Sequence, residues 1–444
     1  MANLTPFRGV LYDPTVVKDI ANVVAPPYDI IDANYQKALY ERHPNNIIRL
    51  ELGMDEPDDS PAKNRYTRAA EFLTAWLKSG ALRRDAQPSL YLYIIEYRPP
   101  SHEATTPIRT LKGFFSTVEL EEFGTGRIFP HENTRSAAKA DRLNLLEACH
   151  ANFSAVFSLY SDPDNRVMQL LEKSVDLQNP RLDFQDDAGL RQRLWSISDP
   201  AVVRAVHDLM QPKPLFIADG HHRYETSLRY RQLRRQQDAS RSKEDTVLQP
   251  YDSVLMLFAA LENPGLTVLP THRVLTHALP ELDTIKAVLG DAFDIHEVPF
   301  QPSEKDVRAR FLDSLRNQGQ SGTVFGLAIR NAPAYFVLSL RASHRPPASA
   351  SERDKLDVSI LQHEIVGTLC PTSAEQEAIV YTKDDQEALD LVQRGVEATG
   401  ALLLNATKVS EVRAVAASGG RMPHKSTYFF PKPLTGLVIN LMEE

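Results

Sequence analysis

The chain has 444 residues, 42% of them hydrophobic and 24% charged, which is typical of a water-soluble globular protein with two or three domains. Its net charge of −8 gives no general attraction to nucleic acid or anionic lipid. Apolar runs such as residues 254–261 are too short to cross a bilayer. Nucleic acid and membranes are therefore not expected as partners.

The cysteines and the N-terminal residues give an expectation for the cellular compartment of the protein. Cys149 and Cys370 form no CxxC unit, which is expected of free thiols in a reducing environment. Residues 1–14 lack the basic and apolar segments of a secretory leader. We expect a cytoplasmic protein.

Helices and strands alternate along the first half of the chain. The sequence predicts helices at 14–22 and 32–41, a strand at 47–52, a helix at 62–80, and strands at 91–97 and 108–118 that pair as a hairpin. A helix at 137–150, a strand at 155–160, mainly helices at 164–210, a strand at 214–218 with a following helix, and a strand at 251–261 complete this half.

The pattern changes after residue 276. We expect helices at 278–293 and 305–317, a hairpin of strands 323–329 and 334–340, a helix at 356–369, a strand at 402–404, a helix at 409–417 and closing strands. This alternation predicts a mixed α/β or α+β protein with domains at 1–275 and 276–444.

The segment Asp219-Gly220-His221-His222-Arg223 lies between a predicted strand and a predicted helix. Backbone N–H groups at a helix N-terminus attract anions. Positive side chains at the same place are unfavourable, because they face the positive end of the helix dipole, and a bound anion would offset this cost. Gly220 allows close approach of a ligand, while Asp219 suits a ribose hydroxyl, an amine or a magnesium ion. The alternative is an ordinary capped helix.

Three further polar segments are candidate site loops. The segment 126–134, which contains His131 and Glu132 and continues to Lys139, Asp141 and Arg142, is suited to phosphate contact, metal contact or proton transfer, or else is a solvated helix start. In Ala25–Asp29, a rigid Pro-Pro turn can fix Tyr28 and Asp29, or simply end a strand.

The third loop holds four candidate anion or substrate ligands: Arg421, Lys425, Ser426 and Thr427. It superficially resembles a P-loop, but His424 replaces the second glycine and the predicted order is helix, loop, strand. A Walker-type nucleoside triphosphatase is therefore excluded. On the predicted strand at 47–52, Arg49 and Glu51 would share one face as a site pair or a surface ion pair.

Four motifs in order, APPYD at Ala25–Asp29, HENT with Asp141-Arg142, ADGHHRYET at Ala218–Thr226 and MPHKSTYFFPKP at Met422–Pro433, resemble the family catalogued as domain of unknown function 1015. The DGHHR element also resembles the phosphate-binding motif of the ParB/sulfiredoxin-like superfamily, which includes free-serine kinases. This resemblance implies a ParB/sulfiredoxin-like nucleotide-binding core with helical insertions and a second α/β lobe. Sulfinic-acid reduction is not expected, because histidines stand where sulfiredoxin needs a cysteine.

The resemblance implies a nucleotide phosphate, from ATP or ADP with Mg²⁺, at Gly220–Arg223, with His131 and Arg142 as further cofactor ligands. It favours Asp29 as the base, with Glu132 and Glu51 as competitors, while His221, His222 and Arg223 stabilise the transferred group. Tyr28, Arg421, Lys425, Ser426 and Thr427 would bind the substrate.

The expected function is a phosphotransferase acting on a small hydroxylated metabolite, most like a free L-serine kinase that makes O-phosphoserine. The alternatives are a nucleotide-binding regulatory switch and a metal-dependent hydrolase that uses the two histidines. A homodimer is left open.

Overall fold

The computed structural model describes residues 3–100, 106–132, 134, 136–239, 248–300, 306–395, 397–423 and 425–442. These residues form a mixed α/β protein, as predicted. The chain divides into two compact units: Met1–Pro130, Thr134–Thr267 and Pro431–Glu444 form the first, and His131–Asn133 and Val268–Phe430 form the second. The domains proposed from the sequence, 1–275 as a nucleotide-binding domain and 276–444 as a C-terminal α/β domain that contributes a site loop, remain a prediction.

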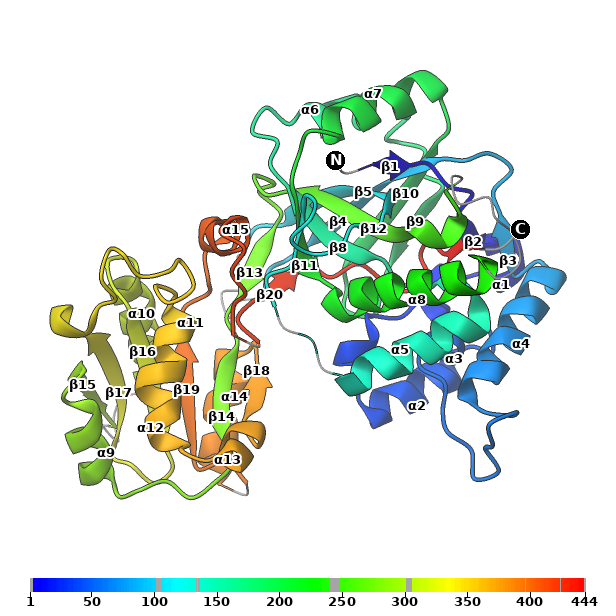
Figure 1. The fold of residues 1–444 in the computed structure, drawn as a ribbon. Coiled ribbons are helices and arrows are strands. Elements are labelled where there is room, and N and C mark those ends of the chain that lie inside the picture. Colours follow the sequence, from blue (N-terminus) through cyan, green and yellow to red (C-terminus); the bar gives the residue numbers. More distant parts are fainter. Residues whose placement is uncertain are drawn as a thin grey trace. The chain divides into compact units, whose positions relative to one another are not determined.

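The first unit is built on one large mixed sheet (Figure 1). In spatial order its strands are β6 (Ile128–Phe129), β11 (Leu215–Asp219), β8 (Val156–Tyr160), β12 (Ser253–Ala260), β5 (Arg109–Glu119), β4 (Leu90–Tyr97), β10 (Arg191–Ile197) and β9 (Leu182–Gln185), with β1 (Leu4–Thr5) on β5. β6 and β11 are parallel, so the chain leaves both strands at one edge of the sheet. The predicted hairpin is confirmed as β4 and β5.

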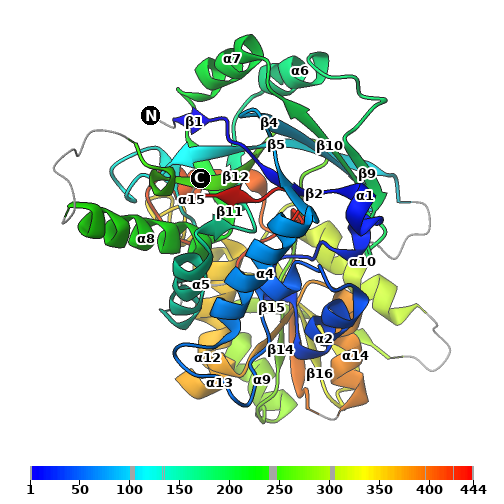
Figure 2. The same ribbon diagram turned by 90° about the vertical axis from the view of Figure 1, so that its right-hand side faces the viewer.

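Helices cover both faces of this sheet. α6 (Arg166–Lys173) and α7 (Pro200–Met210) lie on one face, and α5 (Ser136–Cys149) and α8 (His221–Ala239) lie on the other, as Figures 1 and 2 show. The buried side of α8 carries Tyr224 and Leu228, which join the sheet's hydrophobic core. This burial holds α8 against the sheet and therefore holds the turn between β11 and α8 in place.

The first unit also contains shorter elements before and beside the sheet. These are α1 (Pro14–Val17), η1 (Ile20–Asn22), η2 (Tyr28–Ile30), α2 (Ala33–Arg42), α3 (Ile48–Glu51), α4 (Arg65–Ser79), η3 (Pro250–Asp252), the pair β2 (Val10–Tyr12) with β3 (Leu82–Arg84), and the pair β7 (Ala151–Asn152) with β21 (Asn440–Leu441). β21 lies near the C-terminus, and the chain therefore returns to the first unit after completing the second.

The second unit has its own antiparallel sheet. Its spatial order is β15 (Phe293–Pro299), β17 (Ala334–Leu340), β16 (Val324–Ile329), β19 (Gly400–Leu404), β14 (His272–Leu275) and β18 (Val380–Thr382). The remaining elements are β13 (Thr267–Leu269) paired with β20 (Tyr428–Phe430), α9 (Leu282–Leu289), α10 (Val307–Gly319), η4 (Ala342–His344), α11 (Asp357–Ile360), the π-helical η5 (Leu361–Val366), α12 (Gly367–Leu369), α13 (Ser373–Glu377), α14 (Asp385–Arg394) and α15 (Val409–Ala417). The predicted hairpin is confirmed as β16 and β17.

Two predictions of secondary structure were wrong. The strand expected at 47–52 is the short helix α3, because Asn46 accepts a hydrogen bond from Ile48 N and starts a helical turn. The helices expected through 164–210 are interrupted by the hairpin of β9 and β10, whose turn contains Gly189 at φ +79°. Among the described residues, no helix is long and apolar enough to span a membrane. Both cysteines are free and buried, as predicted.

Candidate functional site

The turn between β11 and α8 has a conformation that requires glycine. Asp219 is the last residue of β11, Gly220 has φ +90°, and α8 starts at His221. A Cβ atom on Gly220 would come within 2.9 Å of the Arg223 guanidinium, which folds back over the turn. His221 is buried and His222 is half-buried at the helix N-terminus. The strand, the glycine turn and the start of the helix therefore lie where the sequence predicted them.

A chain of alternating charges joins this turn to two distant segments. Asp219 pairs with Arg223 at 2.5 Å between Oδ2 and Nη2, and with Lys432 at 2.6 Å between Oδ1 and Nζ. The Lys432 ammonium also lies 2.9 Å from Asp29 Oδ2. The Lys432 side chain is only 8% exposed, so the two carboxylates compensate a largely buried cation.

Lys432 is a further candidate residue, which sequence reasoning missed. The sequence did contain an indication of it: Lys432 stands between Pro431 and Pro433, in one of the motifs that carry the family resemblance. Prolines restrict the backbone on both sides of a lysine, which suits a fixed rather than a mobile ammonium.

A buried ion pair lies beside this charge chain. Arg142 Nη1 lies 3.2 Å from Glu51 Oε1, and both side chains are almost fully buried. Ser154 Oγ donates to the same Glu51 oxygen at 2.9 Å, and the Arg142 guanidinium stacks over the Tyr28 ring at 4.3 Å. Asp141 pairs with Arg142 at 2.6 Å. Residues from four separate segments of the first unit therefore meet here.

The protonation states here follow from burial and charge. Burial raises the pKa of Tyr28 to about 12, although Arg142 and Arg223 oppose the rise, so its phenol stays neutral. Burial alone would lower the pKa of Arg142, but Glu51 and Asp141 outweigh it and raise that pKa. Burial, with the Glu51 charge, raises the pKa of the Cys149 thiol to about 12, which leaves it unreactive.

Arg49 does not share the site with Glu51, contrary to the shared face expected of them. Its guanidinium stacks on the Tyr40 ring at 4.4 Å and donates to Tyr40 O. The helical turn of α3 separates the two side chains, whereas a strand would have aligned them.

Glu225, in the ADGHHRYET segment, connects α8 to the HENT segment and α5. Its Oε2 accepts from Thr134 Oγ1 at 2.6 Å and pairs with Lys139 Nζ at 2.8 Å. Glu225 thereby fixes the start of α5, the helix that carries Arg142.

The remaining candidate residues gather within the second unit. His131 Nε2 lies 3.1 Å from Thr427 Oγ1, and Glu132 Oε1 accepts from Lys425 N at 2.8 Å. Ser426 is buried and donates to Pro423 O. Arg421 is half-buried in the same loop. The HENT and MPHKST segments thus meet each other, while Asn133 and His424 lie outside the described residues.

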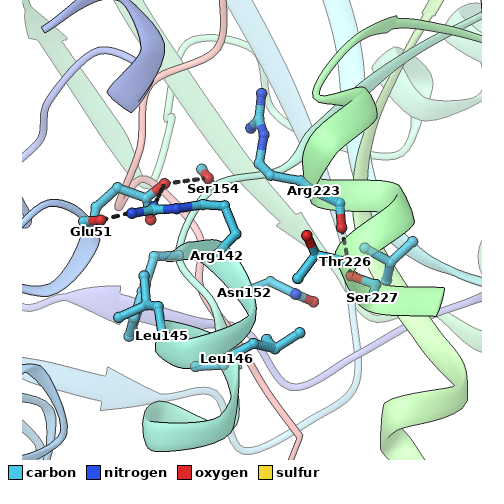
Figure 3. Close-up of a pocket in the computed structure, with 12 residues that line it drawn as sticks. Glu51, Arg142, Leu145, Leu146, Asn152, Ser154, Arg223, Thr226 and Ser227 are labelled. Carbon is cyan, nitrogen blue, oxygen red and sulfur yellow. Dashed lines mark hydrogen bonds and ion pairs between the residues drawn. The ribbon is translucent and has the colours of Figure 1, made fainter. Parts of the chain in front are cut away.

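A small cavity of about 40 Å³ lies next to the buried ion pair (Figure 3). Its polar lining comes from Glu51, Arg142, Asn152, Ser154, Arg223, Thr226 and Ser227, and its apolar lining comes from Leu145, Leu146, Ala151, Phe153 and Val254. Figure 3 shows Thr226 and Ser227 of α8 across this space from Arg142, while the Arg223 guanidinium is directed away from it. A nucleotide is far too large for it.

Comparison with known families identifies the chain. The family described as protein of unknown function DUF1015 matches residues 4–359, and the chain therefore belongs to this family. The family resemblance seen in the sequence motifs is thus confirmed. No curated protein matches the chain.

Several solved structures are similar at low identity. A conserved hypothetical protein from Pyrococcus furiosus is 12% identical with a TM-score of 0.34, covering 73% of this chain and 94% of its own. A free serine kinase in complex with AMP is 11% identical with a TM-score of 0.35, covering 71% and 86%. SbnI from Staphylococcus aureus, truncated at its C-terminus, is 10% identical with a TM-score of 0.34, covering 72% and 85%.

Proposed function

We propose that this chain is a nucleotide-dependent phosphotransferase that acts on a small hydroxylated metabolite, most like a free L-serine kinase. The observation that carries the proposal is the turn between β11 and α8. It presents Gly220, His221 and His222 at a helix N-terminus, beside two carboxylates that share the Lys432 ammonium. Helix amides and histidine donors favour phosphate oxygens.

Magnesium would enter this site bound to the phosphates of the nucleotide. Mg²⁺ is usually held by substrate phosphates and only one or two protein carboxylates. Asp29 and Asp219 supply such a pair, since both reach the same ammonium. The ion would neutralise phosphate charge there.

Among the described residues, the one group of three side chains placed to bind a single metal ion is Glu56, Asp58 and Asp59. This group contains neither His221 nor His222, the two histidines of the alternative metal-dependent hydrolase.

The charged side chains have separate roles in this proposal. Two guanidinium nitrogens of Arg223 are used inside the protein, Nη1 on Ala155 O and Nη2 on Asp219, so Arg223 chiefly orients Asp219. The Asp29 side chain is 32% exposed and can reach an acceptor hydroxyl as a general base or orienting group. Tyr28, neutral at physiological pH, can donate its hydroxyl to a substrate oxygen.

The test combines product detection with a matched pair of variants. Wild type incubated with L-serine, Mg²⁺ and either ATP or ADP should form O-phosphoserine, seen by phosphorus NMR. His222→Ala should lose the nucleotide-induced rise in melting temperature, because it removes a donor from the anion seat. Arg229→Ala, an exposed position on the same helix, should keep that rise.

Asp29→Asn separates binding from chemistry. It should retain the nucleotide-induced rise and lose turnover if Asp29 acts on the acceptor. Nucleotide binding by wild type without transfer to any hydroxylated acceptor would favour the regulatory switch instead. Phosphate release without an acceptor would favour the hydrolase. Equal nucleotide responses of His222→Ala and Arg229→Ala would contradict the assignment of the anion seat.

A further inference from the structure

A second cavity lies at the end of the large sheet where β8 and β12 finish, and residues within 108–112, 162–165 and 260–265 line it. Its volume is about 430 Å³, within the range of about 300–1,000 Å³ that is usual for small-molecule sites. Asp219 pairs with Phe157 near the start of β8, whereas Ala260 pairs with Tyr160, the last residue of β8. The second cavity is therefore at the opposite end of the sheet from the turn of the candidate site.

Hydrogen bonds hold the loops around this cavity in place. Glu262 Oε1 accepts from Ser161 Oγ at 2.6 Å, and Glu262 Oε2 accepts from Asp162 N at 2.8 Å, so the loop after β12 is tied to the loop after β8. Asn263 Nδ2 donates to Lys112 O at 3.1 Å, which ties the same loop to β5. The walls of the cavity are thus formed without a ligand, which reduces the cost of binding one.

Several of the charged groups in the walls are already compensated. Lys112 Nζ lies 2.5 Å from Glu172 Oε1. Asp162 Oδ1 lies 3.2 Å from Lys213 Nζ, and Asp162 Oδ2 accepts from Val167 N at 2.9 Å. These pairs leave no net charge for an occupant to neutralise.

Two exposed groups of opposite charge remain in the walls, Arg109 and Glu262. Among the described residues, the Arg109 guanidinium donates to a hydroxyl, from Nη1 to Thr267 Oγ1 at 3.0 Å, and forms no ion pair. The Glu262 carboxylate accepts from a hydroxyl and a backbone N–H, and it pairs with no cation in the part of the chain that the structure describes. A guanidinium is suited to bind a carboxylate, and a carboxylate is suited to bind an ammonium. A ligand that carries both charges would therefore match both groups.

The remaining wall is apolar. Ile108 exposes 60% of its surface, and it shares the cavity with Pro163, Ala260 and Pro264. Covering apolar surface with an apolar group of a ligand is favourable. The best match to the cavity is therefore a small molecule with one positive charge, one negative charge and an apolar group.

We propose that this cavity binds a free α-amino acid with an apolar side chain. Its carboxylate lies at Arg109, its ammonium lies at Glu262 and its side chain lies against Ile108. This inference goes beyond the proposed function and does not rest on it, because it assigns a second small-molecule site to the first unit.

Calorimetry on the full chain tests which charges the site recognises. The probes are L-valine, L-leucine, L-isoleucine, L-methionine and L-phenylalanine, none of which has a hydroxyl for the proposed transferase to phosphorylate. At least one should bind. Its N-acetyl derivative, without the ammonium, and its amide, without the carboxylate, should each bind about tenfold more weakly or worse, the usual effect of losing a hydrogen bond to a charged group. The proposal is overturned if none of the five binds, or if both derivatives bind as tightly as the parent.

Two substitutions test which residues form the site. Arg109→Gln and Glu262→Gln each remove one charge from the cavity, and each should weaken binding of the amino acid about tenfold. The matched controls are Arg229→Gln on α8 and Glu71→Gln on α4, which remove the same charges at exposed positions outside the cavity. These should bind as wild type does, and circular dichroism should show that all four variants are folded. Equal binding by each variant and its control would overturn the assignment.

Binding of the amino acid at the candidate site would give a different pattern. Asp29→Asn would then lose the amino acid while Arg109→Gln kept it, and this result would also overturn the assignment. The predicted pattern without any phosphoryl transfer would retain the second cavity as an amino-acid site and remove the proposed transferase. Phosphoryl transfer by a protein that binds none of the five probes would do the reverse.

Discussion

Lys432 Nζ lies 2.6 Å from Asp219 Oδ1, so a residue of the C-terminal segment is paired directly with the turn at the centre of the candidate site. The same ammonium lies 2.9 Å from Asp29 Oδ2. One lysine therefore joins three segments that are far apart in the sequence. It acts as a positioning residue for both carboxylates.

Replacing Lys432 should destabilise the first unit. Lys432→Met leaves the largely buried Asp219 and the partly exposed Asp29 without their shared cation, and breaking a buried pair on one side typically costs about 3 kcal/mol. Urea unfolding would measure the loss. Lys355→Met is the control, because Lys355 forms an exposed pair with Glu352 and should change stability by less than about 1 kcal/mol. Equal effects of the two substitutions would show that Lys432 is not structurally important.

Gly220→Ala should affect both stability and the nucleotide response. The φ of +90° costs about 1 kcal/mol or more for alanine, and the new Cβ would displace the Arg223 guanidinium. Gly80→Ala is the control, because Gly80 has φ +79° but nothing within 4 Å of the added atom. We expect both variants to melt earlier than wild type, and only Gly220→Ala to lose the nucleotide-induced rise in melting temperature. Retention of that rise in Gly220→Ala would contradict the proposed role of the turn.

His272 should make the second unit sensitive to mild acid. Burial lowers its pKa to about 4, with Asp385 opposing and Arg273 assisting, and Asp384 also opposing. In the unfolded chain the pKa is about 6.5, so below that pH the unfolded state takes up a proton that the folded state does not. Stability should therefore fall as the pH decreases from about 6.5 to about 4.

His272→Gln removes this titration and should flatten the pH dependence of unfolding across that window. His363→Gln, an exposed position in the same unit, should leave the dependence unchanged. Calorimetric melts at several pH values measure both. A wild-type profile that is already flat between these pH values would exclude a folded-state pKa near 4.

The local features of the site could be predicted from sequence, because they depend on neighbouring residues. The predicted strand at 214–218, Gly220 and the predicted helix after it correspond to β11, the turn and α8 in the structure. The pairing of Asp219 with Lys432 could not be predicted in this way. It depends on the path by which the last residues return to the first unit, which no local pattern encodes.

Glu51 is a second case in which the local sequence did not predict the contact that the side chain makes. Its position in the sequence predicted a strand with Arg49 on the same face, yet Asn46 starts a helical turn and Glu51 is buried against Arg142. A short apolar run cannot distinguish a buried strand from a buried helix, and the pairing of Glu51 with the distant Arg142 is not encoded in the local sequence.

The pairing of β21 with β7, and of Ile439 with Val10, has a consequence for biosynthesis. Residues 268–430 leave the ribosome before β21 does, so the second unit can fold while the first still lacks a strand and the Lys432 ammonium. The charge chain of Asp29, Lys432 and Asp219 is thus assembled late, and a nascent chain stalled before residue 431 would carry the histidines of the turn without the cation that pairs with Asp29 and Asp219.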